Sequence, residues 1–314
     1  MSLPSNPLSI TPSPAEIKNG ALTQKNLEIA IRALSRDGLV VIEDLVPHAI
    51  LDKLNHKMVQ DAYELQSRKD SPFNYHKGNI QQDPPLVKDF FFPEVFTNAI
   101  VTQITSTALG PHPHLRFVSG NTALPPSPSA PPASQPTHND ADFDHPRIPF
   151  ALVINIPLIT MEPHNGSTEV WLGTHASTTI ADQEGAHGER ASGKIKKGLL
   201  EERRAVRPPC QPGIKKGSVV VRDLRLWHGG MPNRSEVPRV MLAMIHFAPW
   251  YRNQMTVEFA DDLRNRLTPE KTGLYVAADY VKSEEVEKSY LNRPYGNAYD
   301  FNQVDKVRDI FSEV

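Results

Sequence analysis

The sequence has very little of what secreted and membrane proteins carry. It contains one cysteine, Cys210, among 314 residues, so no disulfide can form within the chain and a reducing compartment is expected. No run of 18 apolar residues occurs, which predicts no membrane-spanning helix. The stretch from Met1 to Leu8 has neither a basic start nor an apolar run, so no signal peptide is predicted. We therefore expect a cytoplasmic protein.

An excess of charge is also missing. The formal net charge is −2, so no overall field favours nucleic acid or an anionic membrane. The chain has no internal repeat, no GxGxxG motif and no glycine loop that would cradle phosphate. The expected partner is therefore a small-molecule substrate, and the sequence carries no signal for an oligomeric state.

Proline and glycine are abundant instead, with 29 and 17 residues that indicate many turns. Residues 1–14 are rich in serine and proline and are predicted to be a disordered tail. Residues 15–110 are predicted to form a helical support. Within it, apolar spacing predicts a strand and three helices, at 38–42 and at 22–35, 49–65 and 94–109.

From residue 111 to 257 the pattern changes to short apolar stretches between Gly, Pro and Asn turns. Strands are predicted at 115–119, 137–143, 150–158, 168–171, 218–222, 224–228 and 239–247. This cadence favours a jelly roll of two sheets, or a barrel, as the core. Residues 258–314 are polar and are expected to be a C-terminal extension of helices and loops. We predict a single domain over 1–314.

Two His-x-acid pairs occur, and the 12 histidines and 36 acidic residues make more than one expected by chance. His187-Gly-Glu189 lies in a charged stretch without apolar alternation, which is typical of an exposed loop. His138-Asn-Asp140 precedes a strongly strand-like run, 149–158. In extended chain, residues i and i+2 project to the same side. The pair at 138 and 140 is therefore the better candidate for binding a metal.

A distant histidine and an arginine extend this pattern. His-x-Asp followed far downstream by one His is the ligand pattern of a two-His-one-carboxylate Fe(II) site with open positions. His228 takes the distal place, and Arg239 follows eleven residues later. A guanidinium suits a dicarboxylate co-substrate because it grips a carboxylate at two points. Arg239 also opens an apolar run, 240–247, where an unpaired charge would be costly to bury.

Each of these residues also has an ordinary interpretation. His228 alone could be a core histidine, and Arg239 a surface charge. Alternative metal ligands near the first pair are Asp142, Asp144 and His145. One basic stretch is expected to be a solvated loop, and the alternative is that it binds phosphates of the substrate. The stretch comprises Lys194, Lys196, Lys197, Arg203, Arg204 and Arg207.

Together the motifs resemble the phytanoyl-CoA dioxygenase family of Fe(II)/2-oxoglutarate oxygenases, and most closely its fungal natural-product branch. The resemblance covers about residues 25–250. The segments that carry it are Arg36-Asp-Gly-Leu-Val-Val-Ile42, Gln135-Pro-Thr-His-Asn-Asp140, Asn165-Gly-Ser-Thr-Glu-Val-Trp-Leu-Gly-Thr-His175, and Val221-Arg-Asp-Leu-Arg-Leu-Trp-His-Gly-Gly230 with Asn233, Ser235 and Arg239.

The resemblance implies a mainly β fold with flanking helices, the double-stranded β-helix (a cupin-like jelly roll). It implies that iron is bound by His138, Asp140 and His228. It implies that 2-oxoglutarate is bound by Arg239, with Gln135 and Thr168 as further contacts. Halogenases of the family lack the carboxylate ligand, so the presence of Asp140 argues against halogenation.

The expected function is oxidation of a C–H bond in a small organic substrate, with hydroxylation as the default outcome. Two alternatives remain: a cupin-type metalloenzyme that does not use 2-oxoglutarate, and a non-catalytic binding protein on an oxygenase fold. The stretches 124–136 and 174–207 are either surface loops or lids over the site. Three aromatic residues are candidates for an apolar substrate pocket, namely Phe73, Tyr75 and Phe117.

Overall fold

A computed structural model describes residues 5–185, 193–295 and 299–303. Over these residues a nine-stranded sheet has the order β1-β2-β8-β6-β10-β5-β4-β3, with β12 paired to β5. The strands are β1 (Ser9–Ile10), β2 (Leu39–Ile42), β3 (Phe73–Asn74), β4 (His76–Gln82), β5 (His114–Ala123), β6 (Ala151–Pro157), β7 (Thr168–Val170), β8 (Val219–Asp223), β9 (His228–Gly230), β10 (Arg239–Phe247), β11 (Val257–Ala260), β12 (Tyr275–Val276) and β13 (Ala278–Val281). The α-helices are α1 (Pro14–Asn19), α2 (Gln24–Asp37), α3 (His48–Ser67), α4 (Pro93–Phe96), α5 (Ala99–Leu109), α6 (Lys197–Val206), α7 (Pro269–Thr272) and α8 (Ser283–Ser289).

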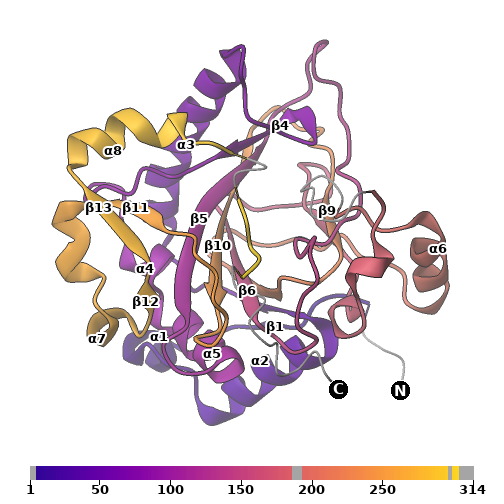
Figure 1. The fold of residues 1–314 in the computed structure, drawn as a ribbon, viewed down its shortest axis with the longest axis horizontal. Helices are drawn as coiled ribbons and strands as arrows, with labels where there is room; N and C mark the ends of the chain where they lie inside the picture. Colours follow the sequence, from indigo (N-terminus) through magenta and orange to yellow (C-terminus); the bar gives the residue numbers. More distant parts are fainter. Residues whose placement is uncertain (1–4, 186–192, 296–298, 304–314) are drawn as a thin grey trace.

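The centre of the large sheet is antiparallel. Strand β10 pairs with β5 on one side and with β6 on the other, and β6 pairs with β8. A small sheet of β7 and β9 is extended by single bridges such as His138 to His228 and Val170 to Cys210. Figure 1 shows α1, α2 and α5 together at one end of the sheet, with α6 on the side away from α8. This is the mainly β jelly roll with flanking helices that the motifs predict, so the predicted fold class is confirmed.

Strands β2, β6 and β8 of the large sheet are buried along their whole length, whereas β3 and β12 at its periphery are partly exposed. In β10, alternate side chains face a cavity and the hydrophobic core. Met241, Ala243 and Ile245 line the cavity. Val240, Leu242 and Met244 belong to the main hydrophobic core. Successive strand residues point to opposite faces, so one face of the sheet supports the site while the other packs under helices. Helix α2 contacts β2, and α3 contacts β4 and β10.

The predicted helices are found with one change. Helix α2 begins after the N-cap Thr23 and ends at Gly38, which has the left-handed φ of 75° that favours glycine. The helix predicted at 94–109 is two helices, α4 and α5. Asn98 divides them, because its side chain accepts hydrogen bonds from the backbone amides of Ile100 and Val101 and caps a new helix.

Other predictions about local structure were wrong. The predicted disordered tail is ordered at Ser9–Ile10, which pairs in parallel with β2, and Ile10 is buried. No strand covers 137–143, where His138 makes only isolated bridges. No strand covers 224–227 either, and β9 begins at His228. The C-terminal extension contains β11 and β13 in addition to helices.

That residues 1–314 form a single domain, with boundaries at residues 15, 111 and 258, remains a prediction. None of the helices in the described residues combines the length and the apolar character needed to cross a membrane.

Candidate metal centre

The structure brings His138, Asp140 and His228 together. One potential ligand atom from each lies within 4.8 Å of the others. The Nε2 atoms of His138 and His228 are 3.6 and 3.7 Å from Oδ1 of Asp140. Backbone pairing creates this closeness, because the amides of His138 and His228 each donate to the other's carbonyl oxygen, at 2.8 and 3.0 Å. Two segments 90 positions apart in sequence thus present their side chains to one point.

Both imidazoles are held in the tautomer that metal binding needs. Nδ1 of His138 is 2.9 Å from the carbonyl oxygen of Pro136, and Nδ1 of His228 is 2.9 Å from that of Leu226. A carbonyl oxygen only accepts, so each Nδ1 carries the proton and donates it. In the neutral form of each imidazole, Nε2 then carries the lone pair on the side of Asp140, as in histidines oriented by a backbone carbonyl at metal sites.

The electrostatics favour the protonation states of metal ligands. Burial, reinforced by the Arg222 guanidinium, holds the pKa of His228 well below its usual value, so its imidazole is neutral. Burial alone would raise the pKa of Asp140, but Arg222 and the neighbouring imidazoles outweigh it and hold the pKa well below its usual range. Neutral imidazoles and an ionised carboxylate bind divalent metals. Two nitrogens, one oxygen and an adjoining cavity fit an iron ion with open positions.

Arg222 orients the carboxylate and was not predicted from sequence. Its Nη2 donates to Oδ2 of Asp140 at 2.6 Å, which leaves Oδ1 facing the histidines. Its Nε donates to Oδ1 of Asn155 on the neighbouring strand at 3.1 Å. The only signal in the sequence was an arginine within the apolar run of β8. Its partner lies 82 residues away, so the pairing becomes visible only in the fold.

Thr178 was also missed. Its hydroxyl oxygen accepts from Trp227 Nε1 at 2.8 Å and from Asn139 Nδ2 at 3.4 Å. Trp227 precedes His228, and Asn139 lies between His138 and Asp140, so a single buried hydroxyl ties both ligand segments together.

The stretch 174–207 also braces the segment that carries His138 and Asp140. The amide of Ile195 donates to the carbonyl oxygen of Thr137, and that of Asn139 to the carbonyl oxygen of Gly193. Gln183 Nε2 donates to the carbonyl oxygen of Ala141 at 2.9 Å. In its described residues this stretch therefore supports the candidate metal centre from outside.

The three residues line a cavity of about 520 Å³, and so does Arg239. Arg239 is 2% exposed. Its Nη2 donates to the carbonyl oxygen of Gly166 at 3.0 Å and its Nη1 to that of Asn121 at 3.4 Å, while Nε has no partner. Burial lowers its pKa to about 10, so it stays charged at neutral pH. No carboxylate of the described residues pairs with it, and a buried charge of this kind is stabilised by an anion in the cavity.

Gln135 and Thr168 line the same cavity. Oε1 of Gln135 accepts from the amide of Gly230 at 2.8 Å. Gly230 pairs with Thr168 across the small sheet, so the two side chains come from adjacent backbone. Phe73, Tyr75 and Phe117 also line the cavity.

The other candidate ligands do not join the cluster. Among the described residues, the grouping that could hold a metal comprises His138, Asp140 and His228, without Asp142, Asp144 or His145. His145 stacks on Phe150 instead, with ring centroids 6.0 Å apart. His187 and Glu189 lie outside the described residues.

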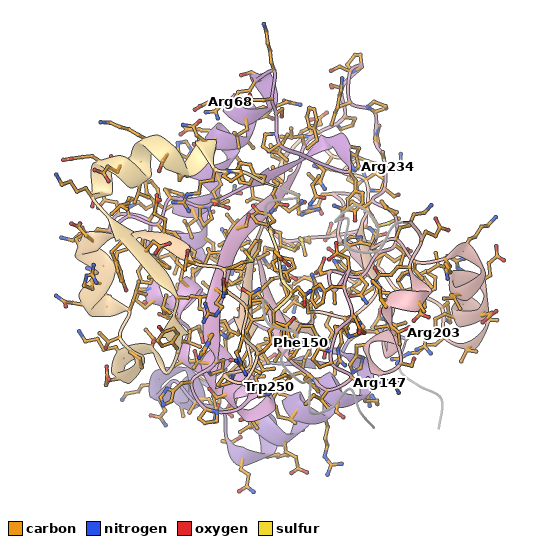
Figure 2. The ribbon with its side chains drawn as sticks, in the orientation of Figure 1. Arg68, Arg147, Phe150, Arg203, Arg234 and Trp250 are labelled. Carbon is orange, nitrogen blue, oxygen red and sulfur yellow. The ribbon has the colours of Figure 1, made fainter. Side chains whose placement is uncertain are left out.

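The three arginines of the basic stretch contact the protein, whereas its three lysines are exposed. Arg203 donates to the carbonyl oxygen of Leu172, Arg204 lies over the Trp171 ring, and Arg207 pairs with Asp37 at 2.9 Å. Figure 2 shows Arg203 on the side of the molecule that α6 occupies. These contacts attach α6 to the jelly roll.

A jelly roll with two histidines, a carboxylate and a buried arginine around one cavity defines a non-haem iron oxygenase. The chain matches the phytanoyl-CoA dioxygenase (PhyH) family over residues 34–241, well over half its length, and belongs to that family. It is accordingly a 2-oxoglutarate-dependent iron dioxygenase by family and by donor set.

Solved structures share this fold. EctD from S. alaskensis, crystallised with 2-oxoglutarate and 5-hydroxyectoine, is 17% identical with a TM-score of 0.53, and the match covers 72% of this chain and 76% of EctD. The epimerase SnoN, in complex with Fe3+, alpha ketoglutarate and nogalamycin RO, is 13% identical with a TM-score of 0.53, covering 72% and 84%. At these identities the likeness establishes the shared fold.

Proposed function

We propose that the chain oxidises a C–H bond of a small organic substrate, with His138, Asp140 and His228 holding Fe(II) and Arg239 binding the far carboxylate of 2-oxoglutarate. When bound, iron and 2-oxoglutarate supply the oxidation: O2 is consumed, succinate and CO2 leave, and one oxygen atom enters the substrate. EctD and SnoN hold 2-oxoglutarate, and SnoN holds iron, which supports the same pair here.

The observation that carries the proposal is the charged Arg239 buried in the same cavity as the three-residue cluster. A cupin-type enzyme without 2-oxoglutarate has no use for a buried cation there. The side chains have separate tasks in this scheme. The histidines and Asp140 fix the metal, Arg222 holds Asp140, and the cavity walls keep water from the reacting centre.

The substrate is proposed to be a natural product rather than a coenzyme A thioester. The three arginines of the basic stretch are engaged with the protein, and none of its six basic side chains lines the cavity. The motifs resemble the fungal natural-product branch, and SnoN belongs to nogalamycin biosynthesis. A cytoplasmic location, Gln135 and Thr168 as 2-oxoglutarate contacts, and hydroxylation as the outcome complete the proposal.

Anaerobic titration of the purified protein with Fe(II) in the presence of 2-oxoglutarate tests this directly. The proposal predicts a visible absorbance band from the chelate, and succinate release on addition of O2 and substrate. Iron binding without the band would favour the cupin alternative. Failure to bind either would favour a non-catalytic protein.

A further inference from the structure

The cavity lining includes aromatic rings that the assigned chemistry does not use. The rings belong to five residues of the lining, namely Phe73, Tyr75, Phe117, Tyr299 and Phe301. They come from three separate parts of the chain: β3 with the residue that follows it, β5, and the C-terminal segment 299–303. The last of these carries no motif and lies outside the range matched by the family.

Phe117, Tyr299 and Phe301 pack against one another and form an aromatic wall. The ring of Phe117 meets those of Tyr299 and Phe301 edge-on, with centroids 4.8 and 5.2 Å apart. The rings of Tyr299 and Phe301 lie nearly parallel, at 16°. Edge-on and offset arrangements of this kind are the favourable ones for aromatic side chains.

The backbone of the C-terminal segment is fixed to the protein core. Tyr251 Oη donates to the carbonyl oxygen of Phe301 at 3.1 Å. Nδ2 of Asn253 donates to the carbonyl oxygens of Asp300 and Asn302, at 2.7 and 2.9 Å. These bonds come from buried residues just after β10, so the aromatic wall is in place before any ligand arrives.

Of the other two aromatic residues, Tyr75 lies beside the candidate metal centre. Phe73 and Tyr75 are 41% and 43% exposed although they line the cavity. Tyr75 has a φ of 68°, a conformation rare for a tyrosine, and its ring centroid is 5.2 Å from that of His138. Strained backbone and exposed rings at a cavity are features of sites that a ligand covers.

The charges of the cavity restrict what this ligand can be. No lysine is found among the described lining residues, and the two arginines are Arg222, paired with Asp140, and Arg239. The remaining charged residue of the lining is Asp142. Asn121 adds a side-chain amide that makes no hydrogen bond to another described residue. A phosphate-bearing or carboxylate-bearing substrate would find no free cation next to the rings.

We propose that Phe117, Tyr299 and Phe301 form the substrate subsite, and that it takes a neutral molecule with a flat or fused ring system and few hydrogen-bonding groups. The ring system packs on the aromatic wall, and Tyr75 steers it toward the metal beside His138. The inference rests on the proposed function, since it needs the metal end of the cavity to be the reacting end. It makes the C-terminal segment a determinant of specificity.

Fluorescence titration with N-phenyl-1-naphthylamine, a neutral two-ring probe, tests the subsite. The anaerobic holoprotein with Fe(II) and 2-oxoglutarate is titrated, and the chelate absorbance is recorded in the same samples. Phe301→Ala and Phe301→Leu are compared with wild type, the leucine variant because it keeps apolar volume but removes the ring. Tyr63→Ala, on an exposed position of α3, is the matched control.

We expect saturable binding by wild type and the Tyr63 variant, with affinity weakened about tenfold in both Phe301 variants and the chelate band unchanged. Acetyl-CoA should not displace the probe. Equal affinity in all four proteins, or no binding by a wild type that forms the chelate, would overturn the subsite. Displacement by acetyl-CoA at concentrations near the probe's Kd would overturn the ligand class. Absence of the chelate band in wild type would instead overturn the proposed function.

Discussion

The two ends of the cavity are built on different physical principles. At the polar end, each metal-ligand side chain is held by a hydrogen bond: His138 to Pro136, Asp140 to Arg222, and His228 to Leu226. On the aromatic side, Phe117, Tyr299 and Phe301 are positioned by ring packing and by backbone bonds to their segment. Hydrogen bonds fix direction, as metal coordination requires, whereas apolar packing fixes shape and tolerates variation. On our proposal, the polar end specifies the reaction and the aromatic side selects the substrate.

The distinction between the two ends of the cavity depends most on the assignment of the metal ligands. We predict that His138→Ala and His228→Ala abolish iron binding and turnover, because each removes one of three protein ligands. The fold should survive, since both side chains line the cavity and the hydrogen bonds that are lost go to backbone carbonyls only two residues away. Iron content after anaerobic loading and the thermal midpoint are the measurements. His164→Ala, at an exposed histidine of the same jelly roll, should behave as wild type. Wild-type turnover in either ligand variant would disprove the assignment.

Substitutions of Thr178 test whether hydrogen bonds hold the metal-ligand segments in place. Thr178→Val removes the acceptor shared by Trp227 and Asn139, and we expect iron affinity to fall about 10- to 100-fold, the usual cost of losing an outer partner of metal ligands. Thr178→Ser keeps the hydroxyl and should restore wild-type affinity. Competition with a chelator of known affinity gives the numbers. Equal affinities for the valine and serine variants would mean that Thr178 only fills space.

His246 provides a smaller test, because it is a buried histidine of β10 with no place at the metal centre. Burial lowers its pKa from 6.5 to about 3, and its Nδ1 lies 3.0 Å from the hydroxyl of Thr105. A histidine kept neutral in the folded state contributes stability above pH 6.5. This contribution is lost as the pH falls from 6.5 toward 3, because the unfolded chain takes up a proton that the folded chain refuses.

We therefore predict that His246→Gln reduces the loss of unfolding free energy in this window by about 1.4 kcal/mol per pH unit. Iron binding at pH 7 should be unchanged. Urea titrations of the wild type and the variant at several pH values between 4 and 7 give the two slopes. Identical slopes would show that His246 titrates normally in the fold.

Sequence alone went furthest at the polar end, because metal ligands are few in kind and their order along the chain is itself a signal. His138, Asp140, His228 and Arg239 were all selected on residue type and spacing, and the fold places them around one cavity. The strand predicted at 137–143 was wrong all the same. The chain there pairs with β9 and with residues 193–195 through single bridges. Such bridges leave no alternation of apolar and polar residues from which they could be predicted.

The supporting contacts were beyond sequence reasoning for a physical reason. Arg222 and Asp140 are 82 positions apart, and Thr178 acts on two segments at once. Neither contact leaves a periodic pattern or a compositional bias in the sequence by which it could be predicted. Tyr299 and Phe301 were treated as part of a polar extension, because two aromatic residues near a chain end carry no pattern until Phe117 is placed beside them.

The most direct test of the division between the two ends is the Kd of 2-oxoglutarate, measured anaerobically with iron in Arg239→Gln and in Phe301→Ala. Glutamine keeps a polar side chain but removes the charge, and a hydrogen bond to a charged group is worth about 1.5–3 kcal/mol. We predict a Kd roughly 10- to 150-fold higher in Arg239→Gln, with unchanged iron affinity, and a wild-type Kd in Phe301→Ala. An unchanged Kd in Arg239→Gln would contradict the account, as would an equal loss in both variants.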